Sequence, residues 1–131
     1  MSELVIRRSV DIEDEIRRAL MPYMTAYVKP LPANFSVPSI EITQVGGTDQ
    51  SGHIDTFEVT LDARAKVAGD ANELLRNAIG ILRSAAGTHH TAIRAVMVNT
   101  SGGWGMDPLR PDLAMYTARI SVVAHLEQTK I

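Results

Sequence analysis

Apolar and polar residues alternate along two long stretches, residues 54–66 and residues 114–127. Successive side chains of a β-strand point to opposite faces of the sheet, so this alternation predicts two strands, each with one apolar and one polar face. The apolar positions are Phe57, Val59, Leu61, Ala63 and Ala65 in the first stretch and Ala114, Tyr116, Ala118, Ile120, Val122, Ala124 and Leu126 in the second.

Two shorter patterns predict two further strands, each joined to a long one through a loop. Ile40 and Ile42 alternate with polar neighbours, and the glycine-rich stretch 46–52 then predicts a flexible hairpin loop. Residues 93–100 are rich in Val and Met and predict another strand. The stretch 101–113 contains glycines and prolines, which punctuate regular structure, so it predicts a long loop.

Apolar residues at helical spacing predict two helices. Ser9 or Asp11 can cap the first, and Pro22 should end it near Met21 because proline removes a backbone hydrogen bond. Asp70 is a candidate cap for the second helix, and Gly87 is a natural stop. The apolar positions are Ile12, Ile16, Ala19, Leu20, Tyr23 and Tyr27 in the first helix and Leu74, Leu75, Ala78, Ile81, Leu82 and Ala85 in the second.

The predicted element order is therefore α-β-β-α-β-β within one α+β domain spanning residues 1–131. Two hairpins joined by a helix favour a four-stranded, mostly antiparallel sheet with both helices packed on one face. Residues 1–9 read as an N-terminal arm, either flexible or a short extended piece. Residues 29–38 carry three prolines and predict an extended connector, and residues 128–131 form a C-terminal tail.

The amino-acid composition limits the kinds of partner that we expect this chain to bind. The chain has 131 residues, is 45% hydrophobic and carries a net charge of −2, with acidic and basic residues interspersed. This charge argues against tight binding to nucleic-acid phosphates, although DNA can pass such a surface without binding. There is no cysteine, no apolar run of membrane-spanning length and no export signal, so we expect a protein made in the cytoplasm without a membrane partner.

The sequence contains no recognisable catalytic signature. The glycines at 102, 103 and 105 lack the spacing of a nucleotide-binding loop, so a flexible or tightly turning loop that presents Trp104 to another chain is the preferred interpretation. His89 and His90 are adjacent and point apart in an extended chain, which makes solvated loop residues a better interpretation than metal ligands. We therefore expect no enzymatic activity, no cofactor and no metal.

The chain resembles the tail terminator, or tail completion, proteins of long-tailed bacteriophages. The resemblance rests on an N-terminal helix, the strand Val-Pro-Ser-Ile-Glu-Ile at 37–42, the turn Val-Gly-Gly at 45–47 and the long alternating strand after it. In the second half it rests on a helix, a strand, a loop with Pro108 and Pro111-Asp112, and the strand segment 116–122. It covers residues 10–127.

The resemblance implies an assembly function. Such proteins form a ring, usually hexameric, that caps the head-proximal end of the tail tube, stops tube polymerisation and joins the head-side connector. The expected partners are further copies of the chain, the tube protein and the connector or stopper protein, with DNA passing through the lumen. The expected location is the neck of the virion, after assembly in the host cytoplasm.

Loops and an open sheet face are the expected contact elements, because binding residues concentrate on loops held by a rigid scaffold. The candidate loop residues are Trp104, Met106 and Arg110 in the stretch 101–113, with Asp49 and Gln50 at the hairpin tip. Arg119, Glu58 and Arg64 are expected on the open face of the sheet, where they could pair across a subunit boundary. For the charged residues, plain solvated surface is an equally good interpretation.

Two other functions fit less well. A head-closure or stopper protein of the neck has a similar size and also forms rings. A small enzyme or ligand-binding α+β domain would need polar groups in a pocket between sheet and helices, but the predicted inward faces are almost wholly apolar.

Overall fold

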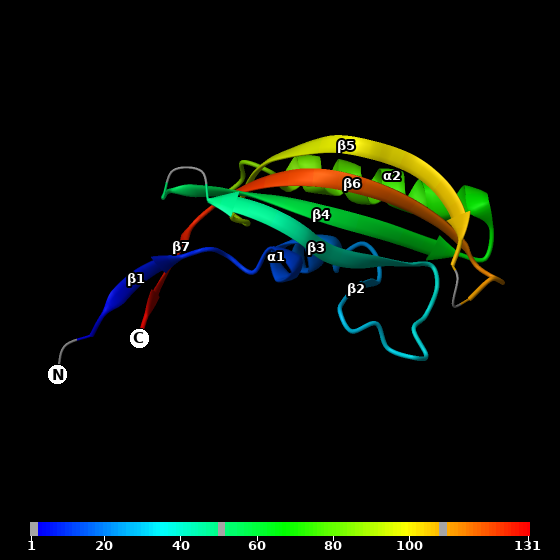
Figure 1. The fold of residues 1–131 in the computed structure, drawn as a ribbon, viewed down its shortest axis with the longest axis horizontal. Helices are drawn as coiled ribbons and strands as arrows, with labels where there is room; N and C mark the ends of the chain where they lie inside the picture. Colours follow the sequence, from blue (N-terminus) through cyan, green and yellow to red (C-terminus); the bar gives the residue numbers. More distant parts are fainter. Residues whose placement is uncertain (1–2, 50–51, 108–109) are drawn as a thin grey trace.

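A long sheet with two helices behind it forms the body of the chain (Figure 1). The computed structural model describes residues 3–49, 52–107 and 110–131. The main sheet has the strand order β2-β3-β4-β6-β5, and β1 and β7 form a separate two-stranded sheet. The elements are β1 (Val5–Arg8), α1 (Ile12–Leu20), β2 (Ala26–Val28), β3 (Ser39–Asp49), β4 (Ile54–Ala65), α2 (Ala68–Ala85), β5 (Ile93–Met106), β6 (Ala114–His125) and β7 (Glu127–Lys130).

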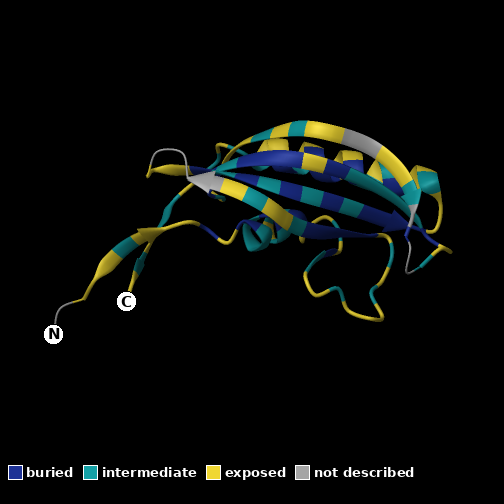
Figure 2. Cartoon of the chain, viewed as in Figure 1, coloured by how far each residue is buried: buried dark blue, intermediate teal, exposed yellow. Residues whose placement is uncertain are grey.

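Both helices pack on one face of the main sheet, and the space between the layers is filled by apolar side chains. Ile16 of α1 and Leu75 of α2 are buried in one cluster with Leu61 of β4 and Ile120 of β6. Burial alternates along β4 as far as Ala63 (Figure 2), which confirms the alternation predicted for that stretch. Along β6 the apolar residues predicted to face inward are buried from Ala118 onward, but Ser121 of the other face is buried as well. Each such Leu or Ile contributes roughly 1.5–3 kcal/mol when fully buried.

The sheet has five strands rather than the predicted four. Pro22 and the turn around it end α1 at Leu20, so Tyr27 does not continue the helical face. The short strand β2 instead pairs in parallel with β3, Ala26 lying opposite Ile40. The fold is thus a single α+β domain with a mostly antiparallel sheet. β2 was not predicted, because Tyr27 fits the helical spacing of the apolar residues before it.

The two predicted glycine loops are shorter than expected. β3 continues through Gly46 and Gly47 to Asp49, with a register shift between Gln44 and Gly46. β5 likewise continues past Thr100 as far as Met106, with register shifts that accommodate its glycines. Cross-strand hydrogen bonding outweighs the weak strand propensity of glycine here, because β-propensity depends strongly on context.

The ends of the two helices agree only in part with the ends predicted from the sequence. Asp11 is the N-cap of α1, and its carboxylate accepts a hydrogen bond from the Asp14 backbone N–H at 3.3 Å. The expected cap at Asp70 is wrong: α2 begins at Ala68, and Asp70 lies in the first turn, where the helix dipole favours an acid. Gly87 ends the helical region with a φ of +82°, a conformation that suits glycine.

The predicted N-terminal arm and C-terminal tail pair with each other. β1 and β7 run antiparallel, with Val5 opposite Lys130 and Arg8 opposite Glu127. We call this pair of strands the β1–β7 ribbon, and it projects from the body of the molecule (Figure 1). The sequence pattern does not predict this pairing, because the two strands lie at opposite ends of the chain.

The packing of α2 gives a first testable prediction. Leu82 is fully buried, so Leu82→Ala should lower the free energy of unfolding by about 2–5 kcal/mol through lost burial and a residual cavity. Asn77→Ala, at an exposed position of the same helix, should change it by no more than about 0.5 kcal/mol. Urea denaturation measures both, and equal effects would contradict the assigned face of α2.

Candidate interaction surface

Trp104 is exposed on an edge strand. It lies near the end of β5 opposite Tyr116 of β6, which packs against the core. The indole is 58% exposed, so it sits at the rim of the helix-covered face and not within the core. The prediction that Trp104 lies in a loop is wrong, but its expected exposure is confirmed. Met106 ends the same strand opposite Ala114, and its side chain lies outside the described part of the structure.

Arg64 is buried, although it was expected on the open face of the sheet. It points away from the helices, but only 8% of the residue is exposed. Its Nε donates to Asp107 Oδ2 at 2.6 Å, and a terminal guanidinium nitrogen donates to Glu41 Oε1 at 2.9 Å. Burial opposes the charge of Arg64, but the hydrogen bonds and charges of the two carboxylates outweigh it and raise the pKa of Arg64. This guanidinium is therefore engaged within the subunit.

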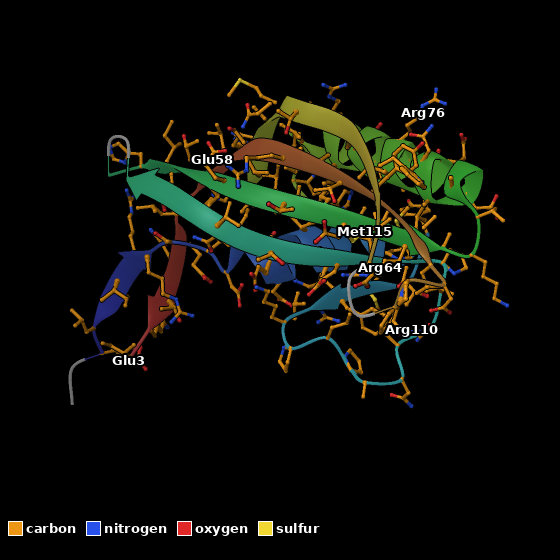
Figure 3. The ribbon with its side chains drawn as sticks, turned by 45° about the vertical axis from the view of Figure 1, so that its right-hand side comes forward. Glu3, Glu58, Arg64, Arg76, Arg110 and Met115 are labelled. Atoms are coloured by element: carbon orange, nitrogen blue, oxygen red, sulfur yellow. The ribbon has the colours of Figure 1, made fainter. Side chains whose placement is uncertain are left out.

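Phe35 and Arg110 cover the same end of the sheet. The Phe35 ring lies 5.6 Å from the guanidinium carbon of Arg64 and 5.7 Å from that of Arg110. Arg110 also donates two hydrogen bonds to the Asp112 carboxylate, at 3.1 and 3.0 Å, which lower the pKa of Asp112. Figure 3 shows Arg64 and Arg110 close together at this end of the sheet. The connector before β3 and the β5–β6 connection are thus joined through these arginines.

The sequence alone does not identify Glu41, Asp107 and Phe35 as members of this cluster. The sequence does contain a signal for one contact, because Glu41 and Arg64 have opposite charges and occupy polar positions of two strands predicted to be neighbours. That signal did not reveal the contact with Asp107, because the covering segments are distant in sequence from Arg64.

Glu58 and Arg119 lie on the open face, as expected. Glu58 is half-buried and accepts hydrogen bonds from Ser121 Oγ at 2.7 Å and from the Asn99 amide at 2.9 Å. Arg119 is exposed, opposite Thr60 of β4. Glu58 therefore has partners within the subunit, whereas Arg119 presents its side chain to the surroundings.

Asp62 lies on the same face between Glu41 and Thr117 on the neighbouring strands. Thr117 Oγ1 donates to Asp62 Oδ1 at 2.7 Å. Burial raises the pKa of Asp62; the Thr117 hydrogen bond and the charge of Arg64 act in the opposite direction without cancelling the effect. The open face thus carries a carboxyl group whose ionisation is disfavoured in the folded chain.

Asp49 is far from the arginine cluster. Asp49 is the last residue of β3, opposite Asp55, and its side chain is outside the described set; Gln50 falls outside it altogether. The β3–β4 hairpin and the β5–β6 connection occupy opposite ends of the sheet (Figure 1). The predicted contact residues therefore fall into three separate regions, namely the two ends of the sheet and the middle of its open face.

A hollow of about 810 Å³ lies between α1 and α2. Glu15, an acidic residue of its lining, accepts hydrogen bonds from Thr91 Oγ1 at 3.0 Å and from the Ala92 backbone N–H at 3.2 Å, which ties α1 to the segment just before β5. This hollow is not the pocket between sheet and helices that a ligand-binding domain was expected to have. Its lining includes Glu15, Arg18, Tyr23, Met24, Arg76, Gly80, Ile81 and His90.

Within residues 3–49, 52–107 and 110–131, no group of three or more acidic, histidine or cysteine side chains is placed to hold a metal ion. In the same part of the chain, no helix is both long enough and apolar enough to cross a bilayer. The sequence matches no protein-family model and no curated protein.

The arginine cluster gives the second prediction. Arg64→Met should lower the free energy of unfolding by about 3–5 kcal/mol, because it removes the guanidinium that pairs with two buried carboxylates. Arg119→Met makes the same chemical change at an exposed site on the same face and should cost no more than about 0.5 kcal/mol. Thermal or urea unfolding compares the two, and a mild effect of Arg64→Met would contradict a stabilising cluster.

The raised pKa of Asp62 gives the third prediction. Because the folded chain holds this proton more tightly than the unfolded chain, Asp62 lowers the free energy of unfolding as pH rises from its unfolded pKa, about 3.9, through its folded pKa. Asp62→Asn keeps an acceptor for Thr117 and cannot ionise. It should therefore gain stability relative to the unmodified chain between about pH 3 and pH 7. A difference that stays constant over this range would contradict the assignment.

Proposed function

We propose that this chain is the subunit of a hexameric ring that caps the head-proximal end of the tail tube of a long-tailed bacteriophage. The ring stops polymerisation of the tube and provides the surface that joins the head-side connector. The subunit acts by contact and needs neither enzymatic activity nor a cofactor. It works in the neck of the virion after assembly in the host cytoplasm, and DNA passes through the lumen without specific binding.

The exposed Trp104 on an edge strand is the observation that carries this proposal. Tryptophan is enriched among the residues that dominate binding energy in protein interfaces, and a half-exposed indole at a sheet rim is available to a neighbouring chain. The α+β fold with two helices on one sheet face is compatible with the helices and strands on which the resemblance rests. Together they support a structural subunit with a protein partner.

The shape of the sheet also suits a subunit with several partners. A ring that joins a tube to a connector needs two different faces, one for each partner, in addition to the contacts between its own subunits. The β3–β4 hairpin and the β5–β6 connection lie at opposite ends of the sheet and differ in sequence (Figure 1). They supply two separate contact regions on one rigid scaffold.

A stopper or head-closure protein is the nearest alternative. It would form a ring as well, but it would bind the connector and leave tube length uncontrolled. Assembly of tail tubes in the presence of the purified chain separates the two functions. Tubes capped at one end and uniform in length support a terminator, whereas rings that bind only the connector support a stopper.

Substitution of Trp104 gives the fourth prediction. Trp104→Ala should fold with nearly unchanged stability, because the side chain is mostly exposed, and should form few rings on tail tubes in electron micrographs. Tyr23→Ala is the matched control, since Tyr23 is an aromatic residue with 71% exposure near the end of α1. Full capping by Trp104→Ala would contradict a role for this side chain in assembly.

A further inference from the structure

β5 forms one edge of the main sheet, and among the described residues no strand pairs with its outer side. Proteins usually protect such an edge with charges, proline or a short strand. β5 is 14 residues long, has Arg94 as its single charged residue and contains no proline. Register shifts interrupt it before Ala95 and after Val98, so the regular segment between these two residues is as long as β1.

The opposite edge of the sheet is protected. β2 covers the first part of β3, from Ile40 to Ile42. Beyond it, the Gln44 backbone N–H donates to Glu13 Oε2 at 2.8 Å, and the Gln44 side chain donates to the Gly46 carbonyl oxygen at 3.3 Å. Side chains therefore occupy the hydrogen-bonding groups on which a further strand would have to pair. Pairing of β3 in one copy with β5 in the next is disfavoured.

Among the described residues, the β1–β7 ribbon has no third strand beside it. Two-stranded sheets are only marginally stable in water unless a third strand or another element covers them. Its base is anchored to the β3–β4 hairpin, where Ser9 Oγ donates to Asp55 Oδ2 at 2.5 Å and the Leu126 N–H donates to the His53 carbonyl oxygen at 3.1 Å. The rest projects from the body, with Leu4 and Val5 more than half exposed (Figures 1 and 2).

We propose that the β1 strand of one subunit pairs with the free edge of β5 in the next subunit. This proposal rests on the ring proposed above and identifies the contact that builds it. Strand addition supplies backbone hydrogen bonds, while Val5 of the ribbon finds an apolar neighbour in Met97, which is 54% exposed. The two surfaces differ, so the contact is heterologous and closes into a ring by rotation.

Cysteine cross-linking tests this contact, because the chain contains no cysteine of its own. Cysteines directly opposite each other on paired strands are close enough to form a disulfide. Val5→Cys would be combined in one chain with a cysteine at 95, 97 or 99, which samples the pairing register. Each double variant would be oxidised and analysed by denaturing electrophoresis, with mass spectrometry to identify the linked residues and electron microscopy to score rings.

We expect a ladder of covalent oligomers for at least one double variant, and no ladder for the single variants. Dimers formed by Met97→Cys alone would show that β5 pairs with β5 of another copy, which overturns the proposal. Rings without any cross-link between residue 5 and β5 would overturn this contact and leave the ring function standing. Absence of both rings and cross-links would count against the ring function and, with it, this contact.

Introducing a charge on the edge of β5 tests the proposed contact independently of cross-linking. Met97→Lys should weaken ring assembly by about tenfold or more in analytical ultracentrifugation, because a lysine on an edge strand opposes strand addition. Met21→Lys introduces the same change at a methionine of similar exposure, 50%, at the end of α1, and should assemble normally. Equal assembly by the two variants would contradict the assignment of β5 as the receiving edge.

Discussion

The pairing of β4 with β6 is the constraint on which the rest of the structure depends. The two strands are each 12 residues long and pair without a register shift from Ile54 opposite His125 to Ala65 opposite Ala114. Because side chains alternate with a period of two, a shift by one residue would turn every apolar side chain toward solvent. This single register therefore fixes the face that α1 and α2 cover and the face that stays polar.

The same pairing explains what the sequence could and could not predict. The faces of β4 and β6 were predictable because alternation and burial have the same period. β2 was not, since three residues carry too little pattern to oppose the helical spacing of Tyr27. Neither was the burial of Arg64, because its cover comes from Phe35 and Asp107, which only the folded chain brings to it. Local pattern determines faces, whereas long-range contacts determine which polar residues remain exposed.

The candidate surface also has features that the local sequence pattern predicts and features that depend on long-range contacts. The exposure of Trp104 and Arg119 was predictable from residue type and strand face, and the structure confirms both. The extension of β5 through its glycines was not predictable, because glycine disfavours strands unless a partner strand supplies the hydrogen bonds. That extension places Trp104 on a strand edge and not in a loop. The change matters for the proposed ring, since an edge strand positions a side chain more rigidly than a loop does.

The distribution of polar contacts indicates which forces are available for the proposed assembly. Arg64 pairs with Glu41 and Asp107 inside the subunit, and all three residues are buried, so their side chains are not available for ion pairs with a neighbour. The β5 edge exposes backbone, the apolar side chains of Met97 and Trp104 and the polar residues Asn99 and Thr100, with Arg94 as the single charged residue of the strand. Isolated surface ion pairs contribute little in any case, whereas strand addition and aromatic burial contribute both affinity and geometry. An interface built on that edge therefore depends on strand register more than on charge.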